Sequence, residues 1–254
     1  MNLGFGRGDS DENVCINYDR LCTAIGFTKE QVVLPNQVHD TVVRRATGAD
    51  CGKGIVKPQD YTSVDAQITN EPGVALAVFG ADCVPVFFYD PVAGAIGTAH
   101  AGWRGTIGRI AEKTVQAMEK EFGSRPEQIE AYIGISICGA CYTVGGEVAE
   151  CFQKEFPEAT WETPEQKREG LCQLDLWQAN RRILEGAGVK PENIVIGNVC
   201  TKCHSGLLFS HRAAGRYRGN MAGFLMLAVK RYKISSNNSF ASEYLNFSSV
   251  LNIC

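Results

Sequence analysis

Short apolar runs separated by turn residues dominate the middle of the chain. Three of these runs have the length and composition of buried strands: residues 74–79, 84–89 and 95–100. Turn-forming residues separate the second run from the third, which predicts a β-hairpin. If this hairpin turns at Pro91 and Val92, Cys83 lies opposite His100, within one residue of register. A thiol and an imidazole would then meet at the open end of the hairpin.

An amphipathic helix is predicted directly after the third strand. Thr106 can cap its N-terminus, apolar residues recur at helical spacing, and Gly123 can end it. The segment HAGWRG, residues 100–105, would then be the loop between a strand and a helix N-terminus. Free backbone N–H groups at such a loop favour an anion.

The rest of the chain contains weaker signals. Amphipathic helices and one strand are expected at three places: helices at residues 147–156 and 176–188, and a strand at residues 193–200. The charged residues 163–170 are expected to form a solvated loop. Residues 233–254 are rich in Ser and Asn without a clear period, so we expect a loosely ordered tail after a single domain at residues 1–232.

Composition excludes several classes of protein. The chain has 254 residues, of which 44% are hydrophobic, so it can bury a sizeable core. A net charge of −3 argues against a nucleic-acid or membrane-surface partner, and no apolar run is long enough to span a bilayer. The N-terminus lacks the pattern of a secretory signal, and eleven cysteines are an odd number. We therefore expect reduced thiols in a cytoplasmic protein.

The segment CTKCH, residues 200–204, is the most conspicuous short motif. Read literally, C-x-x-C-H is a c-type haem attachment site, but that attachment normally takes place outside the cytoplasm. A second C-x-x-C pair stands at residues 138–141, and two such pairs can in principle bind a structural zinc ion. We expect Cys203 and His204 to serve local structure instead.

A different set of residues has the chemistry of a catalytic metal site. Zinc enzymes commonly use three ligands from His, Cys and carboxylate and leave a fourth position for water. His39, Cys83 and His100 supply such a set, and each follows or ends a predicted strand. The spacing alone is a weak signal, because a lone histidine or cysteine is more often structural.

Five segments together resemble the YfiH/laccase-domain family over about residues 2–227. They are NQVH, ADCVP, GTAHAGWRGT, IGISICGACYTVG and the stretch from CTKCH to FSHR. Members of this family have been described as multicopper polyphenol oxidases and as zinc-dependent purine nucleoside phosphorylases. The resemblance implies an α+β fold with a mixed β-sheet core and flanking helices. It also implies that His39, Cys83 and His100 bind the metal.

The implied activity is phosphorolysis of adenosine, inosine, guanosine and methylthioadenosine, with some deamination of adenosine. Arg104, beside the predicted helix N-terminus, could hold phosphate. Further residues are expected to contact the substrate: Asp65 and Asp82 as candidate acids, Trp103 as a base-stacking ring, and Cys141 and Arg212 as pocket-lining groups. The second arginine of the family's FSyRR pattern is Ala213 here, so Arg212, Arg216 or Arg218 would have to compensate.

The chain departs from the family pattern at both ends. Family members usually have a strand and a T-x-R-x-G-G-V-S segment before NLG, whereas this sequence starts at Met1 directly before that motif. We therefore expect an N-terminal strand and a pocket arginine to be absent. The family also commonly ends near Ala228, before the Ser- and Asn-rich tail.

Three other functions compete with the phosphorylase interpretation. A copper-dependent polyphenol oxidase needs several coppers, and four histidines are few for a multicopper cluster. A cysteine hydrolase would use Cys83 as nucleophile and His100 as base, for example on amide bonds of peptidoglycan precursors. The domain could also bind a metal or a partner without catalysis. For the oligomeric state, we favour a monomer.

Overall fold

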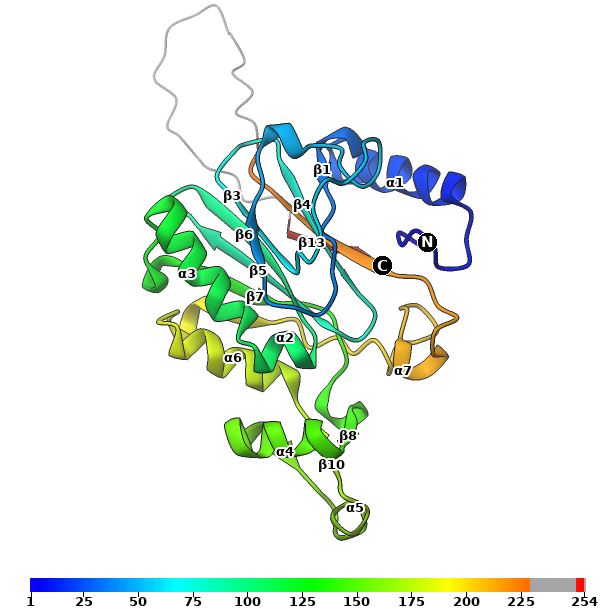
Figure 1. The fold of residues 1–254 in the computed structure, drawn as a ribbon, viewed down its shortest axis with the longest axis vertical. Coiled ribbons are helices and arrows are strands. Elements are labelled where there is room, and N and C mark those ends of the chain that lie inside the picture. Colours follow the sequence, from blue (N-terminus) through cyan, green and yellow to red (C-terminus); the bar gives the residue numbers. More distant parts are fainter. Residues whose placement is uncertain (229–249, 254) are drawn as a thin grey trace, which may run out of the picture.

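The computed structural model describes residues 1–228 and 250–253, and two stacked β-sheets form its centre (Figure 1). The larger sheet has the strand order β11-β7-β5-β6-β3-β2. Its strands are β2 (Val43–Arg45), β3 (Ala66–Thr69), β5 (Val84–Asp90), β6 (Ala95–Ala101), β7 (Glu130–Ile133) and β11 (Ile194–Ile196). The pairs β2–β3 and β7–β11 are parallel and the others antiparallel, so the sheet is mixed.

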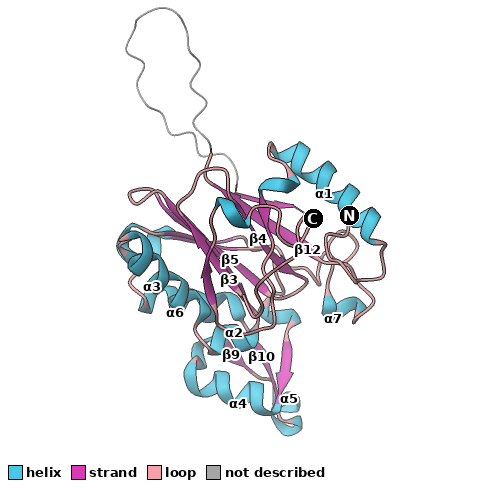
Figure 2. Cartoon of the chain, turned by 45° about the horizontal axis from the view of Figure 1, so that its top comes forward, coloured by secondary structure: helices cyan, strands magenta, loops and turns pink. Residues whose placement is uncertain are grey.

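The second sheet has the order β1-β4-β12-β13. Its strands are β1 (Val32–Val33), β4 (Ala75–Gly80), β12 (Met221–Met226) and β13 (Val250–Ile253). A small antiparallel sheet lies with α4 and α5 at one end of the molecule (Figure 2). It contains β8 (Thr143–Gly145), β9 (Thr160–Trp161) and β10 (Leu171–Leu174), and the helices are α4 (Gly146–Glu155) and α5 (Pro164–Glu169).

Helices cover the outer faces of the two large sheets. The apolar faces of α3 (Ile110–Phe122) and α6 (Leu176–Gly186) pack on the six-stranded sheet. On the other side, α1 (Asp11–Ile25) packs on the four-stranded sheet. Between the sheets, apolar side chains such as Leu76 and Phe87 form a shared core. The expected α+β class with flanking helices is therefore confirmed.

The three central strands lie where the hydrophobic pattern predicted them, but the hairpin register differs. Pro85 pairs with His100, because Asp90 pairs with Ala95 and leaves four residues in the turn. The Asp90 carboxylate accepts hydrogen bonds from backbone N–H groups within this turn, which stabilises the longer loop. Cys83 consequently lies beyond the end of β5 rather than opposite His100.

The predicted helix after β6 is two helices. The first, α2 (Trp103–Ile107), begins earlier than expected, so residues 103–105 are helical rather than part of a loop. Arg109 adopts a left-handed conformation at φ 59° and separates α2 from α3. The Thr106 hydroxyl donates to the Ala101 carbonyl inside the fold and does not cap a helix. Thr114 and its apolar neighbours face the core from α3 as predicted, and this helix ends at Gly123.

The other predictions for the second half have mixed outcomes. Helices α4 and α6 are confirmed, whereas the predicted strand at residues 193–200 is limited to β11. The expected loop at residues 163–170 is helix α5, because Thr163 caps its N-terminus in a capping box with Gln166. A last helix, α7 (His211–Ala214), is short. No helix among the described residues is long and apolar enough to cross a membrane.

The predicted tail is described only in part. Residues 250–253 form β13, which pairs antiparallel with β12 and adds an edge to the four-stranded sheet. The other residues of the expected loosely ordered tail, 233–249 and 254, lie outside the described part of the chain.

Candidate metal centre and pocket

Three side chains from distant parts of the sequence converge between the two large sheets. His39 belongs to the segment after β1, Cys83 to the loop between β4 and β5, and His100 to β6. Their nitrogen and sulfur ligand atoms all lie within 4.8 Å of one another. The Cys83 thiol is 3.9 Å from His39 Nε2, and the two imidazole rings are 4.7 Å apart between centroids. This is the set that the sequence motifs singled out.

Asp65 fixes the orientation of two of these residues. Its buried carboxylate accepts hydrogen bonds from the backbone N–H groups of Val38, His39 and Asp40. It also lies 2.8 Å from His100 Nδ1, so that nitrogen donates and Nε2 is left to face the other ligands. Burial opposes ionisation, but the hydrogen bonds from His100 and the backbone outweigh it and lower the pKa of Asp65. Asp65 is therefore an ionised positioning residue.

The thiol and the buried imidazole shift each other's protonation. Burial of Cys83 disfavours the thiolate, but His100 and His39 outweigh that effect and lower the pKa of Cys83. Burial also disfavours a charged His100, whereas Cys83 and Asp65 raise its pKa above the usual value. Without a metal, these groups favour a thiolate beside an imidazolium. A thiolate is the form in which cysteine binds metals or attacks substrates.

The backbone around the cluster adopts unusual conformations. His39 and Asp82, the residue before Cys83, both have positive φ angles, of 65° and 94°. Asp82 is held there by its carboxylate, which accepts hydrogen bonds from Thr201 Oγ1 and from the backbone N–H of Arg212. At Gly102 a Cβ atom would lie 2.9 Å from the Cys83 sulfur. Because residue 102 is a glycine, the backbone can pass this close to the Cys83 thiol.

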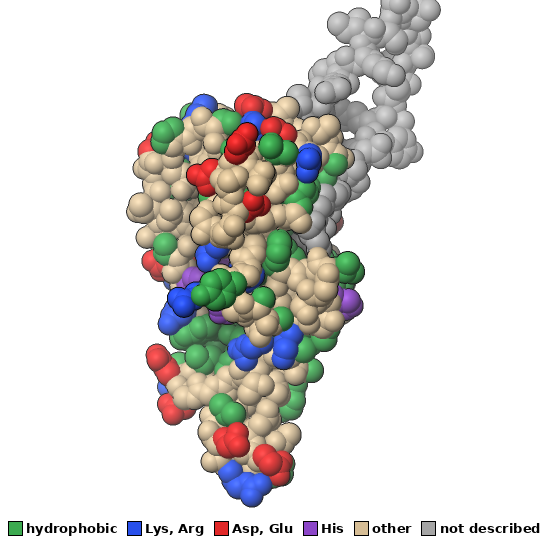
Figure 3. Space-filling view, turned by 90° about the vertical axis from the view of Figure 1, so that its right-hand side faces the viewer, with side chains coloured by type: hydrophobic (Ala, Val, Ile, Leu, Met, Phe, Trp, Pro, Cys, Tyr) green, Lys and Arg blue, Asp and Glu red, His purple; other side chains and the backbone are tan. Residues whose placement is uncertain are grey.

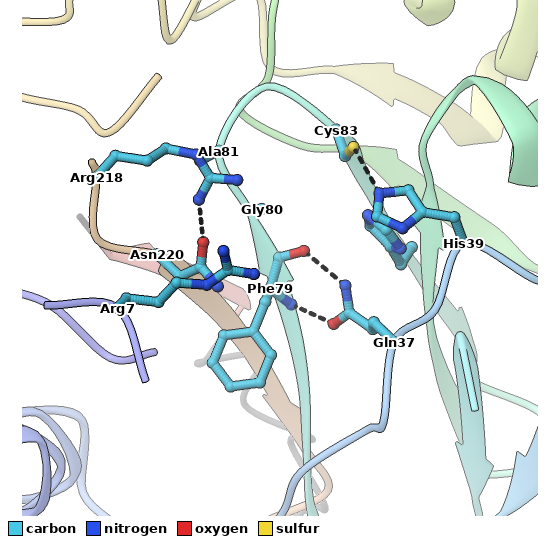
Figure 4. Close-up of a pocket in the computed structure, with 10 residues that line it drawn as sticks. Arg7, Gln37, His39, Phe79, Gly80, Ala81, Cys83, Arg218 and Asn220 are labelled. Atoms are coloured by element: carbon cyan, nitrogen blue, oxygen red, sulfur yellow. Dashed lines mark hydrogen bonds between the residues drawn. The ribbon is translucent and has the colours of Figure 1, made fainter. Parts of the chain in front are cut away.

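A pocket opens beside the cluster and contains two arginines (Figure 4). It is lined by Arg7, Gln37, His39, Phe79, Gly80, Ala81, Cys83, His100, Arg218 and Asn220. Arg7 and Arg218 lie on the side of the pocket away from His39 and Cys83. Burial and the charge of Arg7 both lower the pKa of Arg218, and Arg218 Nε is buried without a hydrogen-bond partner among the described residues. Two close guanidinium groups of this kind favour an anion.

The two arginines are held at the pocket by contacts between the start and the end of the domain. The side chain of Asn2 accepts a hydrogen bond from the backbone N–H of Asn220, and Leu3 donates to the Asn220 carbonyl. Basic and histidine side chains gather around the middle of the face of the molecule shown in Figure 3. Sequence reasoning did not single out Arg7, because no local pattern links residue 7 to residue 218.

The other residues expected to contact substrate do not line this pocket. Trp103 and Arg104 lie on α2, where the exposed Arg104 guanidinium stacks 4.2 Å from the Trp103 ring centre. Arg212 donates to the Thr143 carbonyl, and the Cys141 sulfur is 3.5 Å from that of Cys203. Asp82 is occupied by the two hydrogen bonds described above. Direct substrate contact by these side chains stays a prediction.

These observations define a class of protein: α+β proteins with two large sheets and a His–Cys–His cluster beside a pocket that contains two arginines. Residues 1–228 match the family model described as multi-copper polyphenol oxidoreductase laccase. The chain therefore belongs to this laccase-like family, and the resemblance found in the sequence motifs is confirmed.

Individual relatives are similar over most of their length. The purine nucleoside phosphorylase YlmD of Bacillus subtilis is 36% identical over 229 residues, which are 89% of this chain and 81% of that protein. The adenosine deaminase RL5, from an unknown prokaryotic organism, is 35% identical over 77% of this chain and 74% of its own. The crystal structure of YlmD from Geobacillus stearothermophilus superposes with a TM-score of 0.82 at 37% identity, covering 90% and 85% of the two chains.

Proposed function

We propose that this protein is a zinc-dependent purine nucleoside phosphorylase that also deaminates adenosine. The observation that carries the proposal is the pair Arg7 and Arg218 in one pocket with the His–Cys–His cluster. Phosphorolysis requires a site that holds the attacking phosphate, and the two guanidinium groups supply positive charge for it beside the candidate metal centre. The names of the relatives, a nucleoside phosphorylase and an adenosine deaminase, support the same two reactions. The substrates proposed are adenosine, inosine, guanosine and methylthioadenosine, together with phosphate.

The donor set of the cluster fits zinc. Two imidazoles and one thiolate leave a fourth position open, which is the ligand number of catalytic zinc sites. The hydrogen bond from His100 Nδ1 to Asp65 supports binding through Nε2. Bound zinc would supply a Lewis acid and lower the pKa of a bound water to about 7. His39, Cys83 and His100 would hold the ion.

In the proposed phosphorolysis, Arg7 and Arg218 bind phosphate and orient one of its oxygens toward the sugar. That oxygen forms a bond to the anomeric carbon while the bond from this carbon to the purine nitrogen breaks. The bonding electrons leave with the purine, which then takes up a proton. Asp65, one of the expected acids, is held ionised by its hydrogen bonds, so it supplies negative charge behind His100 rather than this proton.

Product analysis by chromatography tests the proposal. Adenosine and inosine are incubated with zinc-loaded and chelated protein, each with and without phosphate. Release of adenine and hypoxanthine only in the presence of phosphate, and only with metal, is the expected result. Conversion of adenosine to inosine without phosphate would identify the deaminase reaction. No conversion of either nucleoside under any of these conditions would contradict the proposal.

Asp65 offers a test of how the ligands are positioned. In Asp65→Asn, the single amide oxygen replaces only one of the two carboxylate oxygens, so an NH2 group faces either His100 Nδ1 or the backbone N–H groups of Val38 and Asp40, and the hold on His100 is weakened. The zinc concentration that half-activates the chelated enzyme should rise by about 10- to 100-fold, as for other carboxylate partners of metal-bound histidine. Asp40→Asn is the matched control, because Asp40 is exposed and its carboxylate accepts only from Thr41 in the described contacts. Equal activation of Asp65→Asn and the unmodified chain would exclude the positioning role.

A further inference from the structure

A second group of metal-ligating side chains lies outside the pocket. The two C-x-x-C pairs, Cys138 with Cys141 and Cys200 with Cys203, meet although 58 residues separate the pairs in the sequence. All four sulfur atoms lie within 4.8 Å of one another. The sequence predicts local structure for Cys203 and His204. The fold brings together a complete set of four thiols instead.

The sulfur positions suit a tetrahedral ion. With zinc–sulfur bonds of about 2.3 Å, tetrahedral geometry places neighbouring sulfurs about 3.8 Å apart. Cys141 and Cys203 have their sulfur atoms 3.5 Å apart, which is close to this spacing and far from the about 2.05 Å of a disulfide. Cys203 is exposed while Cys200 is buried, so an ion can reach the four thiols from the surface.

The backbone around the thiols is arranged as in a metal-binding turn. The N–H groups of Cys138 and Cys203 both point at the Cys200 sulfur, at 3.3 Å and 3.4 Å. Such N–H donors stabilise a thiolate ligand from outside the metal shell. Each C-x-x-C pair lies on a tight turn, with Cys141 donating to the Cys138 carbonyl and His204 to the Cys200 carbonyl. His204 Nδ1 also contacts that carbonyl, at 2.9 Å, and so takes part in local structure.

The two turns are already held in register by the fold. Ser136 and Cys200 form a parallel bridge, in which Ser136 donates to Val199 and Thr201 donates to Ser136. Thr201 in turn donates to the carboxylate of Asp82, the residue before Cys83. Cys200 and Cys203 therefore lie on the same segment as Thr201, which holds Asp82 in place beside Cys83. An ion bound by the four thiols would link this segment to the turn at residues 136–141.

We propose that Cys138, Cys141, Cys200 and Cys203 bind a structural zinc ion, separate from the ion held by His39, Cys83 and His100. Four thiolates in a tetrahedral arrangement select zinc among the common divalent ions. Binding releases the thiol protons to solvent and changes no oxidation state. All four ligand positions are filled by protein, so this site is closed to substrate and serves structure.

Zinc content tests the proposal directly. The chain, purified with zinc and a thiol reductant, should hold two zinc ions by elemental analysis. Cys138→Ser/Cys141→Ser should hold one, His39→Ala should hold one, and the combination should hold none. Cys15→Ser, on α1 and outside both clusters, is the matched control and should keep two. If only the four-cysteine site binds zinc, the unmodified chain holds one ion that Cys138→Ser/Cys141→Ser loses, which supports this inference while weakening the proposed function.

A second measurement does not depend on folding of the cysteine variants. X-ray absorption spectroscopy of zinc in His39→Ala should give a shell of four sulfurs at about 2.3 Å. A shell with fewer sulfurs would overturn the inference. So would equal zinc content in Cys138→Ser/Cys141→Ser and the unmodified chain, iron in place of zinc, or disulfides within the four cysteines of the freshly purified protein.

Discussion

His39→Ala should lower the rate of nucleoside phosphorolysis by at least about 100-fold, because it removes one of three proposed ligands of the catalytic zinc. Loss of a residue that only orients a ligand typically costs 10- to 100-fold in metal affinity or activity, and loss of the ligand itself costs more. His39 is exposed and its ring contributes little to the core, so the variant should fold. The measurement is kcat/KM for inosine with saturating phosphate.

The same variant separates the phosphorylase from the cysteine hydrolase. A hydrolase with Cys83 as nucleophile and His100 as base would need neither His39 nor a metal. It would survive His39→Ala and chelation but lose activity when Cys83 is alkylated. Val38→Ala is a suitable control, because Val38 is the exposed neighbour of His39 and its backbone N–H contact with Asp65 is retained. Full phosphorolysis by His39→Ala would exclude the proposed ligand role.

Arg218→Gln and Arg7→Gln should each raise KM for phosphate by about 10- to 100-fold. A hydrogen bond to a charged group contributes about 1.5–3 kcal/mol, and each 1.4 kcal/mol corresponds to about tenfold in affinity. Deamination of adenosine uses no phosphate, so its rate should change little in either variant. The measurement is a phosphate titration of inosine phosphorolysis beside a phosphate-free deamination assay.

Arg104→Gln is the informative comparison for these variants. The sequence motifs favour phosphate binding by Arg104, but in the structure its guanidinium stacks on Trp103 and lies outside the pocket lining. We expect Arg104→Gln to leave KM for phosphate unchanged. If it raises KM while Arg7→Gln and Arg218→Gln do not, phosphate binds near α2 and the role proposed for the two pocket arginines is wrong.

Local patterns predicted the parts of this fold that depend on neighbouring residues. The central strands follow from apolar runs, and the motifs around His39, Cys83 and His100 identified the cluster before its geometry was known. Helix α1 was not predicted, although a signal existed. Ser10 caps the helix, and its buried residues Val14, Tyr18, Leu21 and Cys22 recur at helical spacing.

Features that depend on distant residues could not be predicted in this way. The hairpin register was misplaced because hydrogen bonds to Asp90 favour a longer turn than the one assumed. The two cysteine pairs are a weak signal in the sequence, because nothing in the pattern of the family that the chain resembles asks for a second metal site there. Arg7 and Arg218 meet only after the N-terminal segment has docked beside β12.

The anion-binding side of the pocket therefore forms only when residues 2–7 lie against residues 218–220. Residues 2 and 220 are joined by hydrogen bonds, and Arg7 and Arg218 flank that junction. During synthesis the anion site cannot assemble until nearly the whole domain has been translated. In the folded protein, release of residues 2–7 from Asn220 and occupation of the pocket by an anion oppose each other. Phosphate concentration would thus set how firmly residues 2–7 are closed onto residues 218–220, the segment directly before β12.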